Sequence, residues 1–205
     1  ISLFKNGLIN LGIVFSDSLL DKFILYNAEL HRWNKRFGFI NTDDLGELYI
    51  HMLDALSGLP LLKEYGPPSP ILDFGSGAGL PGIPLALCLP DIQFILCERK
   101  AKEAAFLQNI ALLADAKNIT VIEDINQLSC KVGCAVFRAV KTIEELLPIL
   151  DPHLEKQGII FAYKATLTKI SEEKESLKKR YRTIRVHQLQ HPDPSRERHA
   201  VVLCQ

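Results

Sequence analysis

Three glycines alternate along the loop that follows the first apolar run of a repeating strand–helix pattern. Gly75, Gly77 and Gly79 stand between an apolar stretch at 70–74 and a helical stretch at 81–89. Glycine lets the backbone turn tightly at such a junction and lets a ligand approach the main chain closely. The loop therefore indicates an α/β fold whose first strand ends at a binding site.

The chain after residue 70 alternates between short apolar runs and stretches with helical periodicity. Strands separated by helices indicate a mostly parallel sheet with helices on both faces. No helical stretch separates the last two strands, so these should pair antiparallel. We therefore expect an α/β, Rossmann-like domain with a seven-stranded, mostly parallel sheet and an antiparallel last strand. Its strands are predicted at 70–74, 92–97, 119–122, 135–137, 158–163, 183–189 and 200–204, and its helices at 81–89, 99–114, 142–150 and 167–180.

The residues before this domain have helical character. Ser16 is a good N-cap before an apolar spacing of three to four, which predicts a helix to about Trp33, and a second helix is predicted near 44–56. The segment 65–70 is rich in proline, which favours a linker. We place a boundary there, between an N-terminal helical segment, 1–66, and the sheet domain, 67–205.

Cysteine usage and hydropathy indicate a cytoplasmic protein. The five cysteines are odd in number and none has CxxC spacing, so reduced thiols are expected. No set of His, Cys, Asp and Glu has metal-site spacing, so no metal is expected. No apolar run is long enough to cross a bilayer, and the opening residues lack the pattern of a secretory signal.

Charge is spread unevenly along a chain whose formal net charge is zero. Residues 164–205 hold ten basic and five acidic side chains. This basic end favours a polyanionic partner, and a solvated helix face is the structural alternative.

Two motifs overlap in the glycine loop. Residues 77–82 satisfy GxGxxG, which is typical of dinucleotide sites, and residues 73–79 satisfy DxGxGxG. A pyrophosphate needs the open N-terminus of the next helix, but Pro81 and Pro84 remove two of its first-turn donors. The loop therefore favours a nucleoside ligand without phosphate, and S-adenosylmethionine (SAM) is such a ligand.

Two acidic residues flank the loop. Glu98 ends the second strand, where a carboxylate accepts hydrogen bonds from the ribose hydroxyls of either SAM or NAD. Asp73 precedes the loop, where a carboxylate attracts a cationic ligand and repels a pyrophosphate. A solvated strand end for Glu98, and a cap on the loop amides for Asp73, are the structural alternatives.

The fourth strand ends without the (Asn/Asp)-Pro-Pro-aromatic motif that is common in exocyclic-amine methylases, since residues 137–140 read FRAV. An acceptor with its own lone pair needs neither that motif nor a general base, and guanine N7 is such an acceptor. Catalysis would then rest on positioning and electrostatics. We accordingly assign no side chain to a catalytic proton transfer.

Motifs along nearly the whole chain, in order, resemble the glucose-inhibited division protein B family. They are GSGAGLPGIPLAL followed by PDIQFILCE, and the stretches 31–35, 51–54, 137–139, 163–164 and 198–202. The resemblance implies a class I SAM-dependent methyltransferase that modifies guanine N7 in the 530 loop of small-subunit (16S) ribosomal RNA. It also implies SAM contacts at Gly75, Leu80 and Arg138, and adenine contacts at Asn126 and Gln127. The family often has an acid at the last of these positions, so Gln127 is a departure.

Four neighbouring residues in the N-terminal helix are candidates for RNA contact. Trp33, Asn34, Lys35 and Arg36 join a stacking plane to two cations. The structural alternative is that Trp33 anchors the helix and the two cations favour a helix C-terminus.

Two further basic residues lie at predicted strand ends. Lys164 ends the fifth strand and Arg198 precedes the last one, so both are candidates for contact with the acceptor RNA or its phosphates. The structural alternative for Lys164 is a solvated lysine.

Two other functions stay open on residue patterns alone. An NAD-dependent oxidoreductase would use GxGxxG with Glu98, and a non-catalytic RNA-binding module would keep the pocket as a scaffold. The expected partner is ribosomal RNA or the small ribosomal subunit, and a monomer is expected.

Overall fold

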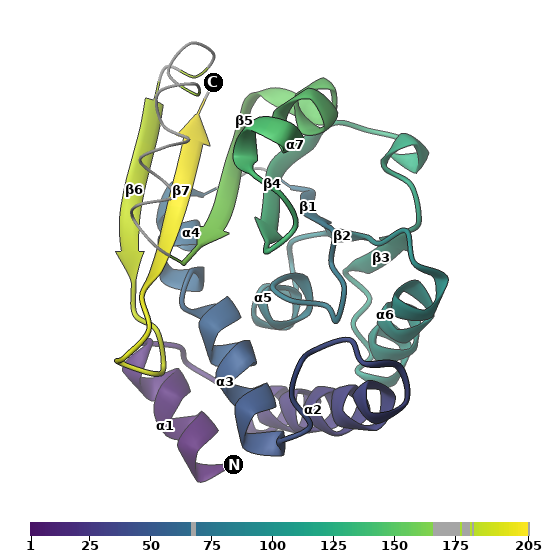
Figure 1. The fold of residues 1–205 in the computed structure, drawn as a ribbon, viewed down its shortest axis with the longest axis vertical. Helices are drawn as coiled ribbons and strands as arrows, with labels where there is room; N and C mark the ends of the chain where they lie inside the picture. The colour runs from purple at the N-terminus through teal and green to yellow at the C-terminus, as the bar shows by residue number, and fades with distance from the viewer. Residues whose placement is uncertain (67–68, 166–176, 178–180, 182, 205) are drawn as a thin grey trace.

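The computed structural model describes residues 1–66, 69–165, 177, 181 and 183–204. Its centre is a seven-stranded sheet in the order β3-β2-β1-β4-β5-β7-β6 (Figure 1). Strand β7 runs antiparallel to both β5 and β6, and the other neighbouring pairs are parallel. The predicted fold class is therefore confirmed. The strands are β1 (Ile71–Phe74), β2 (Phe94–Cys97), β3 (Ile119–Ile122), β4 (Val132–Arg138), β5 (Leu154–Lys164), β6 (Thr183–Leu189) and β7 (Arg198–Cys204).

Helices cover both faces of this sheet. Successive side chains of a strand point to opposite faces, so Ile71 and Leu72 enter two separate hydrophobic clusters. The cluster of Ile71 contains side chains of α1 to α6, whereas the cluster of Leu72 contains α7 together with Leu177 and Tyr181. Strands β4 and β5 point toward the end of the molecule where α2 and α3 lie (Figure 1). The helices are α1 (Ser2–Asn10), α2 (Asp17–Phe37), α3 (Leu45–Leu56), α4 (Leu59–Tyr65), α5 (Gly82–Cys88), α6 (Ala101–Leu113) and α7 (Ile143–Leu150).

The N-terminal helices pack onto the sheet domain. Ser16 begins α2 by accepting a hydrogen bond from Leu19 N at 3.1 Å, and Gly38 ends it with a φ of 67°. The buried Tyr26 of α2 donates from its hydroxyl to Ala78 O in the glycine loop at 2.6 Å. The boundary at residue 66 stays a prediction, and α1 to α4 share one hydrophobic cluster with the sheet.

Most predicted elements are present, with different bounds. Helices α1 and α4 have no predicted counterpart, because α1 buries only Phe4 and Leu8 and α4 is a seven-residue helix with a proline in its first turn. Strands β4, β5 and β7 extend beyond the predicted apolar runs into polar ends such as Lys164 and Arg198. The helix predicted at 167–180 lies outside the described residues, apart from Leu177.

Candidate functional site

The loop after β1 lies against the ends of β2 and β4. Gly75, Gly77 and Gly79 have φ values of 73°, 53° and 88°, in the left-handed region that favours glycine. Gly75 N donates to Cys97 O at the end of β2 at 2.9 Å. A Cβ on Gly75 would lie 2.7 Å from Val140 Cγ2, which is too close. The alternating glycines therefore serve the turn and its close approach to the segment after β4.

The N-terminus of α5 holds no open row of amides for a phosphate. Gly82 N donates to Asp73 Oδ2 at 2.9 Å, and Ile83 N donates to a loop carbonyl at 2.8 Å. Pro81 and Pro84 have no amide proton. The donors that bind pyrophosphate in dinucleotide sites are thus used internally or missing, and this supports a ligand without phosphate.

Glu98 connects the end of β2 to the glycine loop. Its Oε2 accepts from Gly77 N at 2.8 Å and its Oε1 accepts from Lys100 N at 3.0 Å. The residue is only 7% exposed. The carboxylate is therefore held against the loop and is not a solvated strand end.

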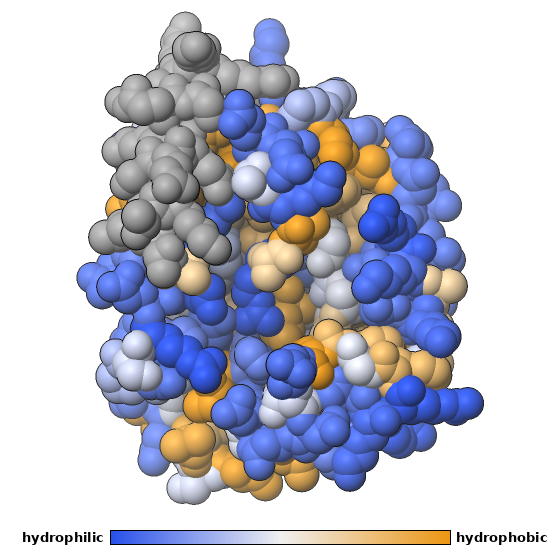
Figure 2. Space-filling model, in the orientation of Figure 1, coloured by the Kyte–Doolittle hydropathy of each residue, from blue (hydrophilic) through white to orange (hydrophobic). Residues whose placement is uncertain are grey.

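A cleft of about 550 Å³ opens beside this carboxylate. It lies between the glycine loop, the end of β2, the segment after β3 and the β4–α7 connection. A hollow with an apolar to neutral floor and hydrophilic rims occupies the middle of the face in Figure 2. The volume of the cleft suits a nucleoside ligand. The lining residues are Phe74, Gly75, Gly77, Cys97, Glu98, Arg99, Lys100, Glu123, Asp124, Ile125, Ala139, Val140, Lys141, Leu146 and Ile149.

Asp73 lies beneath the loop and is fully buried. Its Oδ2 accepts from Gly82 N, while its Oδ1 has no hydrogen-bond partner among the described residues. Burial raises the pKa of this carboxyl from 3.8 to about 7, and the hydrogen bond from Gly82 opposes that rise. The structural alternative, a cap on a loop amide, is therefore present, and the second oxygen is buried without a partner among the described residues.

Leu80, the next predicted SAM contact, is buried at 5% exposure directly after Gly79. Its backbone amide donates to Ser76 O at 3.1 Å. Leu80 and Gly79 therefore shape the loop from behind and do not line the cleft.

The segment after β3 uses its polar side chains to fold itself. Asp124 Oδ1 accepts from the backbone amide of Asn126 at 2.8 Å, and Gln127 Oε1 accepts from Glu123 N at 3.0 Å. The residues that line the cleft here are Glu123, Asp124 and Ile125. The adenine contacts that the family resemblance implies, Asn126 and Gln127, follow these lining residues in the short 3-10 turn Ile125–Gln127 and stay a prediction.

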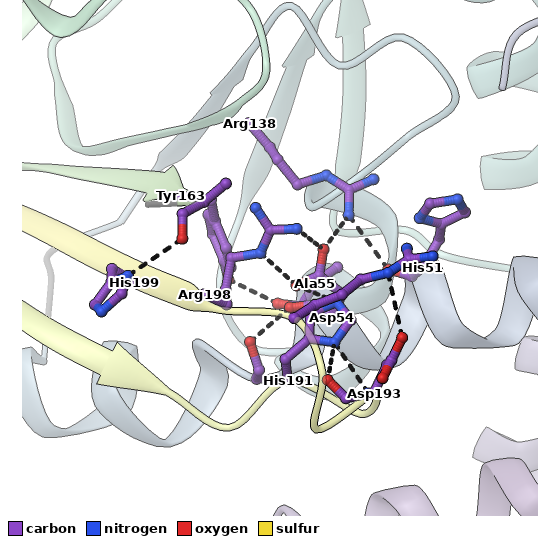
Figure 3. A network of polar contacts seen from close by, with 12 residues as sticks. His51, Asp54, Ala55, Arg138, Tyr163, His191, Asp193, Arg198 and His199 are labelled. Atoms are coloured by element: carbon purple, nitrogen blue, oxygen red, sulfur yellow. Dashed lines mark hydrogen bonds and ion pairs between the residues drawn. The ribbon is translucent and has the colours of Figure 1, made fainter. Parts of the chain in front are cut away.

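A buried ion network joins α3 to the ends of β4 and β7 (Figure 3). Asp54, 1% exposed, accepts from Arg138 Nη1 at 2.8 Å and from Arg198 Nε and Nη2 at 2.6 and 2.8 Å. His191 Nε2 lies 3.7 Å from the same carboxylate. Because two guanidiniums share one carboxylate, these three side chains carry a net positive charge. Both arginines were candidate site residues from the sequence, but Asp54 was not, because an acid inside an apolar helix gives no local sign of its partners.

The predicted RNA contacts fall into two groups. At the C-terminal end of β5, Lys164 is paired in register with His199 of β7, next to Arg198. The other group lies on α2, where Asn34 is buried and its amide accepts from Ile40 N and donates to Thr42 O. The Asn34 side chain therefore holds the loop after α2, and its position gives no support to an RNA contact.

The other members of the α2 group are more open. Trp33 packs on Phe106 of α6 at 5.6 Å between ring centroids and stays half-buried, so its predicted anchoring role is present. Lys35 and Arg36 are exposed near the C-terminus of the helix. Both cations are thus placed where a nucleic acid can reach them.

The described parts of the chain contain neither a metal-ligand cluster nor a membrane-spanning helix. In them, no group of three or more His, Cys, Asp and Glu side chains has the geometry of a metal site. Within the same residues, no helix combines the length and the apolar character that a membrane span requires.

Two of the solved structures that are similar to this chain are titled as methyltransferases. The chain is similar to a precorrin-6y C5,15-methyltransferase from Geobacter metallireducens, with a TM-score of 0.56, 16% identity and coverage of 75% of this chain and 88% of that one. It is also similar to a tRNA (m1A58) methyltransferase from Aquifex aeolicus, with a TM-score of 0.56, 13% identity and coverage of 73% and 68%. These likenesses bear on the fold alone.

Relatives at higher identity share one name, ribosomal RNA small subunit methyltransferase G. The protein of that name from Borrelia turicatae is 37% identical over 173 residues, covering 83% of each chain. The one from Polynucleobacter asymbioticus is 32% identical over 167 residues, covering 78% of this chain and 75% of its own. The model of the rRNA small subunit methyltransferase G family (GidB) matches residues 19–201. The suspected resemblance is thereby confirmed, and the chain belongs to the rRNA small subunit methyltransferase G family.

Proposed function

We propose that this protein transfers a methyl group from SAM to N7 of a guanine in the 530 loop of 16S ribosomal RNA, in the cytoplasm. The observation that carries the proposal is the contrast between two neighbouring features. The α5 N-terminus is closed to phosphate, whereas the cleft beside it is open and has the Glu98 carboxylate at its wall. A nucleoside without a pyrophosphate fits that contrast, and membership of a methyltransferase family agrees with it.

The residues present fit SAM. Gly75 and Gly77 present bare backbone to the cleft, and Glu98 is placed to accept hydrogen bonds from ribose hydroxyls. Asp73, buried beneath the same loop, is assigned to the site as a support of the loop through its hydrogen bond from Gly82 N. SAM, when bound, supplies an activated methyl group on a positively charged sulfur.

The remaining cofactor residues are assigned as proposals. We assign Gly79 and Leu80 to support of the loop, Arg138, the last residue of β4, to the carboxylate of the ligand, and Asn126 and Gln127 to the adenine. Arg138 has a hydrogen bond to Asp54, so contact with a ligand requires it to share or leave that carboxylate.

The methyl transfer requires little from the protein beyond positioning of the two reactants. Guanine N7 carries a free lone pair, so attack on the methyl carbon needs no general base. Holding the two reactants in line and excluding water is then the main contribution of the chain. The RNA is proposed to meet Trp33, Lys35, Arg36, Lys164 and Arg198, and the protein is proposed to act as a monomer.

The oxidoreductase alternative is disfavoured because α5 offers no amides for the pyrophosphate of NAD. The non-catalytic RNA-binding alternative makes a different prediction, binding without turnover. Both are addressed by one assay.

The test uses small ribosomal subunits from cells that lack this modification. They are incubated with the protein and SAM labelled in its methyl group, and the RNA is then cleaved chemically at N7-methylguanine. We expect label in 16S RNA and one new cleavage site in the 530 loop. A folded, SAM-binding sample that leaves the subunits unlabelled, or labels an exocyclic amine, contradicts the proposal.

A further inference from the structure

The last turns of α2 carry two parallel rows of side chains. Arg32 and Arg36 form a row of guanidiniums, and Trp33 and Phe37 form a row of rings. Residues four apart lie on the same helix face, so the rows run side by side. Together they line a hollow of about 280 Å³, separate from the cleft beside Glu98.

The ring wall of this hollow is supported from behind. Trp33 packs on Phe106 with ring centroids 5.6 Å apart, and Phe39 packs on Phe106 at 5.4 Å. Phe37 stacks on Phe39 at 5.9 Å with an interplanar angle of 16°. Trp33 and Phe37 nevertheless stay half-buried, so part of each ring remains open. A braced and partly exposed aromatic wall is suited to stacking a planar ligand.

Cations surround the rings. Arg36 Cζ lies 5.1 Å and Lys102 Nζ 5.0 Å from the centroid of Phe37. Arg32 pairs with Glu29 at 2.5 Å, but neither Arg36 nor Lys102 has a carboxylate within 4 Å among the described residues. The hollow therefore joins apolar ring faces to uncompensated positive charge, which complements a polyanion with aromatic bases.

The hollow also lies close to the methyl-transfer cleft along one helix. Lys102 is in the first turn of α6, and Lys100, the N-cap of that helix, lines the cleft. The beginning of α6 therefore separates the two cavities. A strand of RNA whose target guanine enters the cleft can place a neighbouring nucleotide at α2.

We propose that this hollow binds an unpaired nucleobase of the RNA substrate, stacked on Trp33 and Phe37, with the adjoining phosphates held by Arg36 and Lys102. The inference rests on the proposed function, which supplies the RNA. It adds a second base-binding position and brings Phe37 and Lys102 into substrate recognition. Stacking of this kind tolerates any base, so the hollow sets affinity and register more than sequence.

Trp33 provides a direct probe because it is the single tryptophan of the chain. A short single-stranded RNA of mixed sequence is titrated against the protein while tryptophan fluorescence is recorded. We expect saturable quenching by this RNA and much weaker quenching by an abasic oligonucleotide of equal length, which keeps the phosphates and lacks the bases. Equal quenching by both oligonucleotides, or none by either, overturns the proposal.

Variants separate stacking from charge. Phe37→Leu keeps apolar volume and removes a ring, and we expect the KM for RNA to rise about fivefold or more with kcat retained. Phe37→Tyr keeps the ring and should restore the wild-type KM. Arg36→Ala should lower the salt dependence of RNA binding by about one phosphate contact.

The matched control positions lie at the C-terminal end of α6 and in the segment that follows it. Leu112→Ala removes an apolar side chain that is 79% exposed, and Lys117→Ala removes an exposed cation; both should leave the KM unchanged. SAM affinity and the melting temperature are measured for every variant, so that a folding defect is recognised.

The two proposals fail differently. If the wild-type protein binds SAM but labels no guanine N7, the proposed function fails. If it labels the RNA while Phe37→Leu has the wild-type KM, the base-binding hollow is wrong. Quenching by assembled small subunits, with no quenching by either oligonucleotide, indicates a ribosomal protein at the hollow and also overturns the inference.

Discussion

Replacement of Asp54 by asparagine tests how much the buried network contributes to the fold. The change removes the negative charge but keeps one acceptor oxygen for two guanidiniums that now make three short hydrogen bonds with the carboxylate. Removing one partner of a buried ion pair costs about 3–5 kcal/mol, because the opposite charge is left uncompensated. Since asparagine keeps one acceptor, we expect about 3 kcal/mol for Asp54→Asn, or a fall in Tm of about 6–12 °C for a chain of this size.

The assay is urea denaturation followed by circular dichroism, together with thermal melting. Asp115→Asn is the matched control, because Asp115 and Lys117 form an exposed pair at 3.8 Å and Asp115 has a φ of 45°, which asparagine tolerates. The control should change stability by less than about 0.5 kcal/mol. An Asp54→Asn variant as stable as the control would refute the reasoning that the two arginines depend on this carboxylate.

Three further predictions concern the loop and its surroundings. Gly75→Ala should weaken SAM binding at least tenfold in calorimetry, because its Cβ meets Val140 at 2.7 Å and its φ is positive; unchanged affinity would show that the loop tolerates a side chain. The pKa of Asp73 is raised to about 7, so between pH 4 and 7 the native state binds more protons than the unfolded state and stability falls as pH rises. The fall, about 1.4 kcal/mol per pH unit from this group, should be missing in Asp73→Asn when urea midpoints are compared at pH 5 and 8, and an equal slope in both proteins would contradict it. A thiol reagent at pH 8 should label the exposed Cys130 much faster than Cys97, because burial raises the pKa of Cys97 to about 12. Mass spectrometry of the labelled peptides measures the two rates, and faster labelling of Cys97 would contradict the prediction.

The spacing of apolar residues along the chain and the residue types at turns made the sheet predictable. The alternation of apolar runs and helical stretches depends on local sequence, so the approximate strand positions, the mostly parallel sheet and the antiparallel pairing of the last two strands could be predicted. The prolines at 81 and 84 also predicted the closed N-terminus of α5, because the loss of an amide proton is a property of the residue itself. By contrast, α1 and α4 bury few side chains of their own and give little periodic signal.

The site was predictable where backbone chemistry decides it and not where long-range pairing does. Glu98 and the glycines were placed by their spacing after the first two strands. Asp54 was not, because the carboxylate is paired with residues 84 and 144 positions away in the chain. The role of Asn34 in holding the loop after α2 could not be predicted either, because an asparagine at this position of a helix could equally face solvent.

SAM binding to the cleft is the most direct test of the account, and isothermal titration with wild-type protein and Glu98→Gln measures it. Glutamine offers one acceptor oxygen where Gly77 N and Lys100 N each require one, so the loop support and the ribose contact are both impaired. We predict that one SAM binds per chain, that Glu98→Gln binds about tenfold or more weakly, and that NADH gives no heat. Tight binding of NADH with no response to SAM would contradict the claim that this crevice holds a nucleoside without phosphate.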